Sequence, residues 1–207
     1  LKRAAWRRWG LGPAPVGMLT AEQHEAWHDG EPPPCDMVLT HADTAYTEDE
    51  ANDPCAATTW GQWTDALGRS HLMLLAGWDE RLEFTPLINR IVKDVETYGV
   101  DLLQIEGKAT GKSVIQELRR QRIYAKEFNP GSKSKTSRAH SVAPVLEAGV
   151  VWAPAYGSWV ERIIDQCDAF PNSSHDDLVD TVVMALMTMR QMSDLVVNED
   201  RETDDPW

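Results

Sequence analysis

The sequence predicts an α/β fold in which a mixed β-sheet is flanked by helices on both faces. Short apolar strands separated by turn residues occupy residues 37–78, which predicts antiparallel hairpins. From residue 84 onward, segments with helical periodicity alternate with strands, which predicts parallel strands joined by helices. The chain has 207 residues, of which 42% are hydrophobic, so we expect one ordinary domain with a single large core.

Residues 1–35 predict a basic N-terminal arm or interdomain linker followed by a short helix. The first ten residues are basic and rich in tryptophan, and a Gly/Pro-rich stretch follows them. Thr20 with Gln23 forms a capping-box pattern, which predicts a helix running to about Gly30. The chain lacks an initiator methionine and a secretory signal, so we expect it to be a fragment of a longer intracellular chain.

The short helix contains a formal match to a zinc motif. His24, Glu25 and His28 have the HExxH spacing, which places two histidines on one helix face with a glutamate beside them. A triple proline closes the helix and little chain precedes it, whereas a zinc protease helix is buried beside a substrate-binding strand. Surface histidines are therefore the favoured interpretation over a zinc site.

The central strand is expected at Met37–Ala45. Its run of three apolar residues and a threonine is typical of a strand buried on both faces. It places Asp43 where a core strand emerges, and a carboxylate there is costly unless it is paired or binds a metal. The remaining elements follow from the periodicity of the chain and from its glycines and prolines. They are strands Cys55–Trp63 and His71–Trp78 around a turn at Asp65–Gly68, helix Phe84–Tyr98 ending at Gly99, strand Val100–Ile105, helix Thr110–Arg122, strand Ile123–Phe128, a helix kinked at Pro144 and ending at Gly149, strand Val150–Trp152, and helices Ser158–Cys167 and Asp176–Met192.

Charge is distributed unevenly along the chain. The net charge is −13, which is unfavourable for binding nucleic acid. Residues 106–140, however, hold nine Lys/Arg against three Glu, and residues 194–207 form an acidic tail with six acids against one Arg. We therefore expect a local basic surface. No apolar run is long enough to span a membrane, and three cysteines without a CxxC pair favour a reducing compartment.

The stretch Gly107–Ser113 resembles a phosphate-binding P-loop but is one residue too short, because Glu106 stands where GxxxxGK[ST] needs glycine. A shorter loop would not wrap the same phosphates. It is more simply interpreted as a glycine-rich helix start, where backbone amides and Lys108 or Lys112 meet a phosphodiester.

Acidic residues gather at the start of the last helix. Ser174 can cap this helix, and Asp176 and Asp177 suit the helix dipole, which is the purely structural interpretation. Asp180 shares their face, and three crowded carboxylates repel each other unless a cation lies among them. If the strands ending in Asp43 and Glu106 are parallel neighbours, their ends lie about 5 Å apart. Such an oxygen-only cluster suits two divalent cations, Mg²⁺ or Mn²⁺, which together clamp a phosphodiester.

These motifs, over about residues 37–190, resemble the nuclease domain of the terminase large subunit of tailed bacteriophages. The resemblance rests on Thr-His-Ala-Asp-Thr-Ala, Ile-Glu-Gly-Lys-Ala-Thr-Gly, Lys-x-x-Arg-Ala at Lys135–Ala139, Glu-Ala-Gly-Val-Val, and Phe-Pro followed by His-Asp-Asp-Leu-Val-Asp. It implies a ribonuclease H-like fold and a two-metal endonuclease that cuts concatemeric DNA during genome packaging. The family's first acid corresponds to Asp43 and its second to Glu106, while the third is one of Asp176, Asp177 and Asp180. The expected catalytic residues are thus Asp43, Glu106, Asp177 and Asp180, with all five acids as candidate metal ligands.

The resemblance also implies partners and a division of the chain. Double-stranded DNA would contact Lys108, Lys112, Lys133, Lys135 and Arg138. A packaging ATPase domain in the same full-length chain, a portal protein and a small terminase subunit are the implied partners, in the host cytoplasm during phage assembly and away from membranes. We expect an N-terminal arm with a short helix at 1–35, the nuclease domain at 36–193 and the acidic tail at 194–207. The alternatives are a resolvase- or transposase-like nuclease of the same fold and a non-catalytic docking domain.

Overall fold

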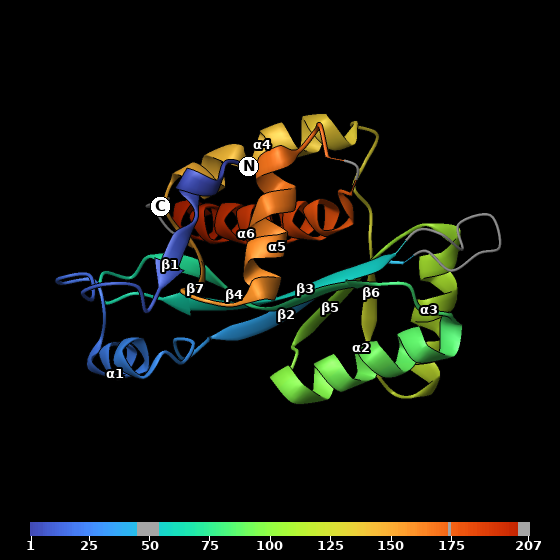
Figure 1. Cartoon of the computed structure of the whole chain (residues 1–207), viewed down its shortest axis with the longest axis horizontal. Coiled ribbons are helices and arrows are strands. Elements are labelled where there is room, and N and C mark those ends of the chain that lie inside the picture. The colour runs from blue at the N-terminus through green and yellow to red at the C-terminus, as the bar shows by residue number, and fades with distance from the viewer. Residues whose placement is uncertain (45–53, 174, 203–207) are drawn as a thin grey trace.

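A computed structural model describes residues 1–44, 54–173 and 175–202, with side chains described as far as residue 192, apart from residue 109. The described strands form one seven-stranded mixed sheet in the order β1-β7-β4-β3-β2-β5-β6 (Figure 1). The strands are β1 Arg7–Trp9, β2 Met37–Asp43, β3 Cys55–Thr64, β4 Ser70–Glu80, β5 Leu102–Glu106, β6 Ala125–Phe128 and β7 Val151–Pro154.

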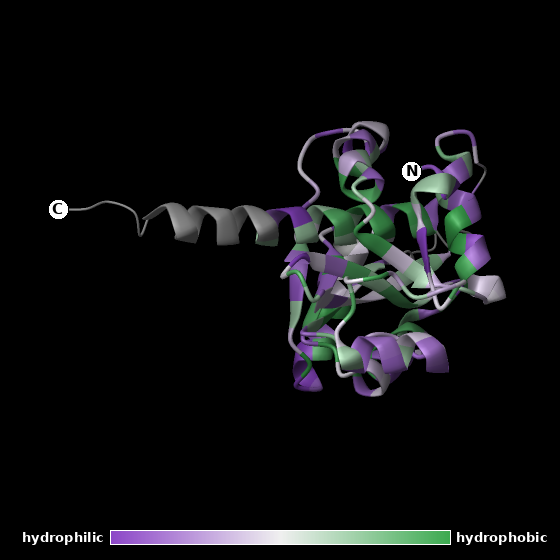
Figure 2. Cartoon of the chain, turned by 90° about the vertical axis from the view of Figure 1, so that its left-hand side faces the viewer, coloured by the Kyte–Doolittle hydropathy of each residue, from purple (hydrophilic) through white to green (hydrophobic). Residues whose placement is uncertain are grey.

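Helices cover both faces of this sheet, as predicted. Helices α4, α5 and α6 lie on one face, and α1, α2 and α3 lie on the other (Figure 1). Apolar residues gather along the inner sides of these layers and polar residues on the outer sides (Figure 2). The helices are η1 Arg3–Ala5, α1 Ala21–Asp29, α2 Phe84–Tyr98, α3 Ala109–Arg120, α4 Lys135–Glu147, α5 Ser158–Ala169 and α6 Asp177–Glu202. The helix α6 extends beyond its expected end, so residues 194–202 of the acidic tail continue it, while residues 203–207 lie outside the described part.

Strand pairing follows the two predicted motifs. The antiparallel pairs β2–β3 and β3–β4 are the predicted hairpins. The pairs β2–β5 and β5–β6 are parallel; α2 leads from β4 into β5, and α3 joins β5 to β6 as a strand–helix–strand unit requires. Helix α2 has the predicted bounds and ends at Gly99, whose left-handed φ of 60° suits glycine.

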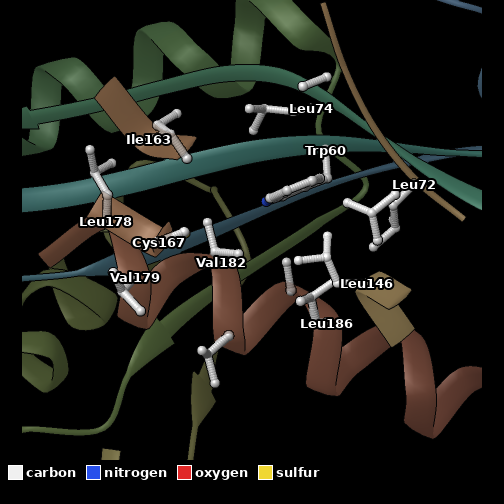
Figure 3. Packing of buried hydrophobic residues seen from close by; sticks show 14 of the residues in the cluster. Trp60, Leu72, Leu74, Leu146, Ile163, Cys167, Leu178, Val179, Val182 and Leu186 are labelled. Atoms are coloured by element: carbon white, nitrogen blue, oxygen red, sulfur yellow. The ribbon is translucent and has the colours of Figure 1, made fainter. Parts of the chain in front are cut away.

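The largest core cluster fixes helix α6 on the sheet. The α6 residues Leu178, Val179, Val182 and Leu186 are all at most 1% exposed. They pack toward Trp60, Leu72 and Leu74 of the sheet and toward α4 and α5 (Figure 3). Each such side chain contributes about 1.5–3 kcal/mol when fully buried. Because this apolar stripe faces the core, the direction of the acidic side chains on α6 is fixed with it.

The N-terminal segment differs from the expected arm or linker. Residues Arg7–Trp9 form β1, which pairs in parallel with β7 at the sheet edge. Trp9 is 2% exposed and packs against Trp27, Trp63 and Trp152. The apolar area of these rings holds the segment on the sheet.

The arginines of this segment are used within the fold. Arg3 forms ion pairs with Glu161 and Asp165 of α5, at 2.6 and 2.5 Å, and Arg8 also pairs with Glu161. The basic character of the N-terminus therefore serves to attach it to α5.

Helix α1 confirms the predicted capping box of Thr20 and Gln23 and ends at Gly30. Its HExxH histidines lie at the surface side of the helix: His28 is exposed, His24 is half-buried, and their rings are stacked at 6.2 Å. The buried side of α1 is formed by Trp27, which makes this helix a packing element. Within the described part of the chain, no helix is both long and apolar enough to span a membrane.

The turn between β3 and β4 is tied together by Asp65. This carboxylate accepts hydrogen bonds from the backbone of Leu67 and Arg69, from the Arg69 side chain and from His71 Nε2. His71 Nδ1 in turn accepts a hydrogen bond from Trp152, at 3.2 Å, which joins the turn to β7. Burial opposes ionisation of Asp65, but these hydrogen bonds lower its pKa to about 2.

We therefore expect an acid-sensitive contribution to stability from Asp65. Its folded-state pKa lies below that of the unfolded chain, so the contribution is full above about pH 4 and is lost as the pH falls toward 2. Urea unfolding at several pH values between 2 and 7 measures it. In Asp65→Asn the free energy of unfolding should be lower at pH 7 and change less between pH 4 and pH 2. The same pH profile in wild type and Asp65→Asn would contradict this, and Asp165→Asn at the surface is the control.

Candidate active site

Two carboxylates meet where neighbouring parallel strands end. Ala42 of β2 is paired with Ile105 of β5, and the next residues are Asp43 and Glu106. The predicted parallel pairing is confirmed, and it puts the two residues about one strand spacing, roughly 4.8 Å, apart. Burial, and then the charge of Glu106, raise the pKa of Asp43, so its place beside Glu106 disfavours its charged form.

A lysine bridges this pair of acids. Lys108 precedes the first residue of α3, and its Nζ lies 3.2 Å from Asp43 Oδ2 and 2.8 Å from Glu106 Oε2. Burial acts to lower the pKa of Lys108, but the two carboxylates outweigh it and raise this pKa. The ammonium group therefore stays charged and compensates part of the negative charge at this edge.

The start of α6 brings the other acids to the same place. Burial is the main cause that raises the pKa of both Asp177 and Asp180, and the charge of Asp43 contributes to each shift. Lys135, the first residue of α4, lies 2.8 Å from both Asp176 Oδ1 and Asp180 Oδ2. The strand acids and the helix acids thus belong to one electrostatic cluster, hereafter the acidic cluster: Asp43, Glu106, Asp176, Asp177 and Asp180.

Arg138 joins the two halves of the acidic cluster. Its NH2 lies 3.3 Å from Asp180 Oδ1, and its NH1 lies 3.8 Å from Glu106 Oε1. Its side chain is only 12% exposed. A narrow cleft opens beside it, lined by Glu106, Arg138, Asp180 and apolar side chains that include Phe128 and Met184. Arg138 lies on α4 one turn after Lys135, so both bases reach Asp180.

The expected DNA contacts divide into two groups. Lys108, Lys135 and Arg138 bind carboxylates of the acidic cluster, a role that sequence reasoning missed. The signal for it was present, since Lys108 follows Glu106 by two residues and Lys135 and Arg138 are one helical turn apart. Lys133 is exposed, and Lys112 lies 3.8 Å from Glu127, so these two lysines lie outside the acidic cluster.

The residues present fit an oxygen-liganded divalent cation. In the part of the chain that the structure describes, no three acidic, histidine or cysteine side chains already stand as a metal-binding group. Glu106 Oε2 is nevertheless buried without a well-aligned hydrogen bond, and the Lys108 ammonium is its near partner. A donor set made of carboxylate oxygens suits a divalent metal cation. A cation between Asp43 and Glu106 would take the place that the Lys108 ammonium occupies.

The glycine-rich stretch after β5 has a structural explanation. Helix α3 begins at Ala109, which leaves only Gly107 and Lys108 between it and β5. A Cβ atom on Gly111 would lie 2.1 Å from the carbonyl oxygen of Glu106. Gly111 therefore allows the helix to approach the strand end, and the two-residue connection is too short to wrap a nucleotide phosphate.

Five strands lie in the order β4-β3-β2-β5-β6, and acids stand at the ends of β2 and β5 and on the last helix. This arrangement places the fold in the ribonuclease H-like class of nucleases. Residues 41–189 match the model of the terminase RNaseH-like domain, and the chain belongs to this family.

Solved structures of terminase nucleases have the same fold. The chain is similar to the large terminase nuclease of thermophilic phage G20c with bound magnesium, at 14% identity and a TM-score of 0.57, covering 89% of this chain and 94% of that one. It is also similar to the human cytomegalovirus terminase nuclease domain, at 14% identity and a TM-score of 0.57, covering 88% and 91%. The nuclease domain of the large terminase of bacteriophage SPP1 with bound manganese matches at 14% identity and a TM-score of 0.50, covering 83% and 93%. No curated protein sequence matches the chain.

Proposed function

We propose that this chain is the DNA endonuclease domain of a phage terminase large subunit and that it hydrolyses phosphodiester bonds with two divalent cations, Mg²⁺ or Mn²⁺. The observation that carries the proposal is the meeting of Asp43 and Glu106 at the ends of two parallel strands, with the acids of α6 beside them. The G20c nuclease with bound magnesium and the SPP1 nuclease with bound manganese support a divalent cation at this site.

The ligands proposed are Asp43 and Glu106 together with Asp177 and Asp180 of α6. When bound, the two cations supply an activated water and stabilise charge on the attacking and leaving oxygens of the phosphodiester. The sheet and the packed face of α6 hold the carboxylates in fixed positions, so little reorganisation accompanies the reaction. Arg138, which contacts Glu106 and Asp180, is a positioning residue for both.

Lys108 has two roles in this proposal. It neutralises Asp43 and Glu106 in the metal-free chain, and its side chain is 52% exposed at the mouth of the site. If Asp43 and Glu106 held a cation, the Lys108 ammonium would be available to a backbone phosphate of the DNA. Metal binding and DNA binding would then strengthen each other.

We propose residues 36–193 as the nuclease domain, with residues 1–35 packed on its sheet through β1 and α1. In the full-length terminase this domain would act with a packaging ATPase domain, a portal protein and a small terminase subunit on double-stranded concatemeric DNA. The place of action would be the host cytoplasm during phage assembly.

The test is cleavage of supercoiled plasmid DNA by the purified chain. We expect nicked and linear products with Mn²⁺ or Mg²⁺, and none with excess chelator. Titration of Mn²⁺ followed by calorimetry should give two bound ions per chain. Cleavage that persists in chelator, or intact plasmid at every metal concentration, would contradict the proposal.

DNA binding is expected to depend on the exposed lysine Lys133. If it contacts a phosphate, Lys133→Ala should weaken binding regardless of DNA sequence and reduce the slope of log K against log salt by about 0.9. Fluorescence anisotropy with Ca²⁺ in place of Mg²⁺ measures this without cleavage. Lys93→Ala, which removes an exposed lysine of α2, is the matched control. An unchanged salt slope in Lys133→Ala would remove this residue from the interface.

A further inference from the structure

The sheet has an open edge inside the molecule, along the second half of β4. Strand β7 pairs with β4 only at Leu72 and Met73. Beyond this point β4 continues to Glu80, and in the described part of the chain no strand pairs with its outer side there. From Leu72 to Trp78 the strand carries neither a charge nor a proline, two of the means by which an edge strand is protected; a register shift occurs at Leu75, and the charged Asp79 and Glu80 end the strand.

Two helices flank this open edge, one on each face of the sheet. On one face, Trp78 donates a hydrogen bond to Asp94 of α2, and Arg90 of α2 stacks over the Trp78 ring at 5.2 Å. On the other face, Asp79 binds Arg162 and Gln166 of α5, at 2.8 and 3.1 Å. Between the helices lies a groove of about 590 Å³ that follows β4 from Leu75 to Glu80, with Tyr98 and Trp159 among its walls.

The groove has the position and size of a missing strand. Its lining runs along β4 from Leu75 to Glu80, and residues of α2 and α5 line its two sides, where they would meet the alternating side chains of an added strand. Six residues of β4 offer about 20 Å of backbone. Its volume lies within the range of roughly 300–1,000 Å³ that is usual for ligand sites.

We propose that this groove binds an extended peptide segment of a partner protein as an additional β-strand beside residues 75–80, with an acidic side chain of the peptide against Arg162. Backbone hydrogen bonds to β4 would supply affinity, and the walls would select side chains. Arg162 supports an acidic residue because its side chain is 61% exposed, whereas its partner Asp79 is 5% exposed. The contact with Asp79 uses NH2 alone, so the guanidinium, which lines the groove, has further N–H donors for a second carboxylate. The proposal is independent of the nuclease activity.

Other occupants fit this groove less well. The edge of a second folded copy would carry its own helices on both faces, and these would collide with α2 and α5. Duplex DNA needs a surplus of positive charge, but Arg90 and Arg162 are balanced by Glu80 and Asp79. A free extended segment meets neither obstacle.

The whole chain serves as the target, and peptides that bind it are selected from a displayed library of random nine-residue peptides. Enriched peptides are synthesised and their affinity is measured by fluorescence polarisation. We expect them to contain Asp or Glu and to protect backbone amides within residues 75–80 from hydrogen exchange. Arg162→Gln should weaken binding at least about tenfold, because a charge-assisted hydrogen bond is lost. Gln166 still holds Asp79 in this variant.

The matched control is Arg120→Gln, which removes an exposed, ion-paired arginine from α3 outside the groove and should leave affinity unchanged. Plasmid cleavage should be unaffected by Arg162→Gln, which separates this proposal from the nuclease. The proposal is overturned if no peptide is enriched, if protection falls outside residues 75–80, or if both arginine variants weaken binding equally. Competition by duplex DNA would assign the groove to nucleic acid, and a dimer blocked by Arg162→Gln would assign it to a second copy.

Discussion

Asp43→Ala is expected to abolish DNA cleavage while the fold remains intact. Asp43 ends β2 next to Glu106, where two carboxylates together can hold a divalent cation. The cation stabilises the transition state by several kcal/mol, so losing a ligand should reduce cleavage by a factor of at least about 10³. In the metal-free chain the ionised carboxylate opposes folding, because burial and Glu106 raise its pKa. Lys108 keeps its ion pair with Glu106 in the variant.

The melting temperature without metal should therefore stay the same or rise. Mn²⁺ is expected to stabilise the wild type, and this stabilisation should disappear in the variant. Plasmid nicking and thermal unfolding with and without Mn²⁺ measure both effects. Asp165→Ala, which removes a surface carboxylate that pairs with Arg3, is the control and should cleave normally. Normal cleavage by Asp43→Ala would refute the proposed metal site.

Asp177→Asn and Asp180→Asn are each expected to reduce cleavage by at least about 100-fold, whereas Asp176→Asn should change it little. Burial raises the pKa of Asp177 and Asp180, and the charge of Asp43 contributes to both shifts, so both lie within electrostatic reach of Asp43. Asp180 is 8% exposed and is held by Lys135 and Arg138. Asp176 precedes the helix and binds Lys135.

Cleavage rates over a range of Mn²⁺ concentrations distinguish the roles of these acids. A ligand variant should stay inactive or need far more Mn²⁺, while Asp176→Asn should keep the wild-type dependence. The loss of Asp177 from the first turn of α6 should cost no more than about 1 kcal/mol of stability. If both Asp177→Asn and Asp180→Asn cleave normally, α6 has only a structural role and the remaining ligands lie elsewhere.

Local patterns in the sequence were sufficient for most of the secondary structure. The apolar period of Phe84–Tyr98 and the glycine after it define α2, because helix periodicity and a left-handed end residue are local properties. The β1 strand at Arg7–Trp9 could not be predicted in this way. It is three residues long and exists because its tryptophan packs against rings from α1, β3 and β7.

The basic residues that contact the acidic cluster could not be assigned from local patterns either. The sequence indicated that residues 106–140 are basic, and from this we expected Lys108, Lys135 and Arg138 on a DNA-binding surface. The structure directs these three side chains to carboxylates, because α4 packs beside α6 and brings Lys135 and Arg138 to Asp180. A charge count cannot tell a free lysine from one whose partner lies 45 residues away.

The sequence by itself determined that this chain has a mixed sheet between two layers of helices, and that its acids follow two strands and begin one helix. Only the tertiary structure decided which strands are neighbours, which bases neutralise the acids and where the sheet remains open beside β4. The physical reason is that periodicity and capping depend on residues a few positions apart. Strand pairing and ion pairing instead depend on how distant segments bury their apolar surfaces together.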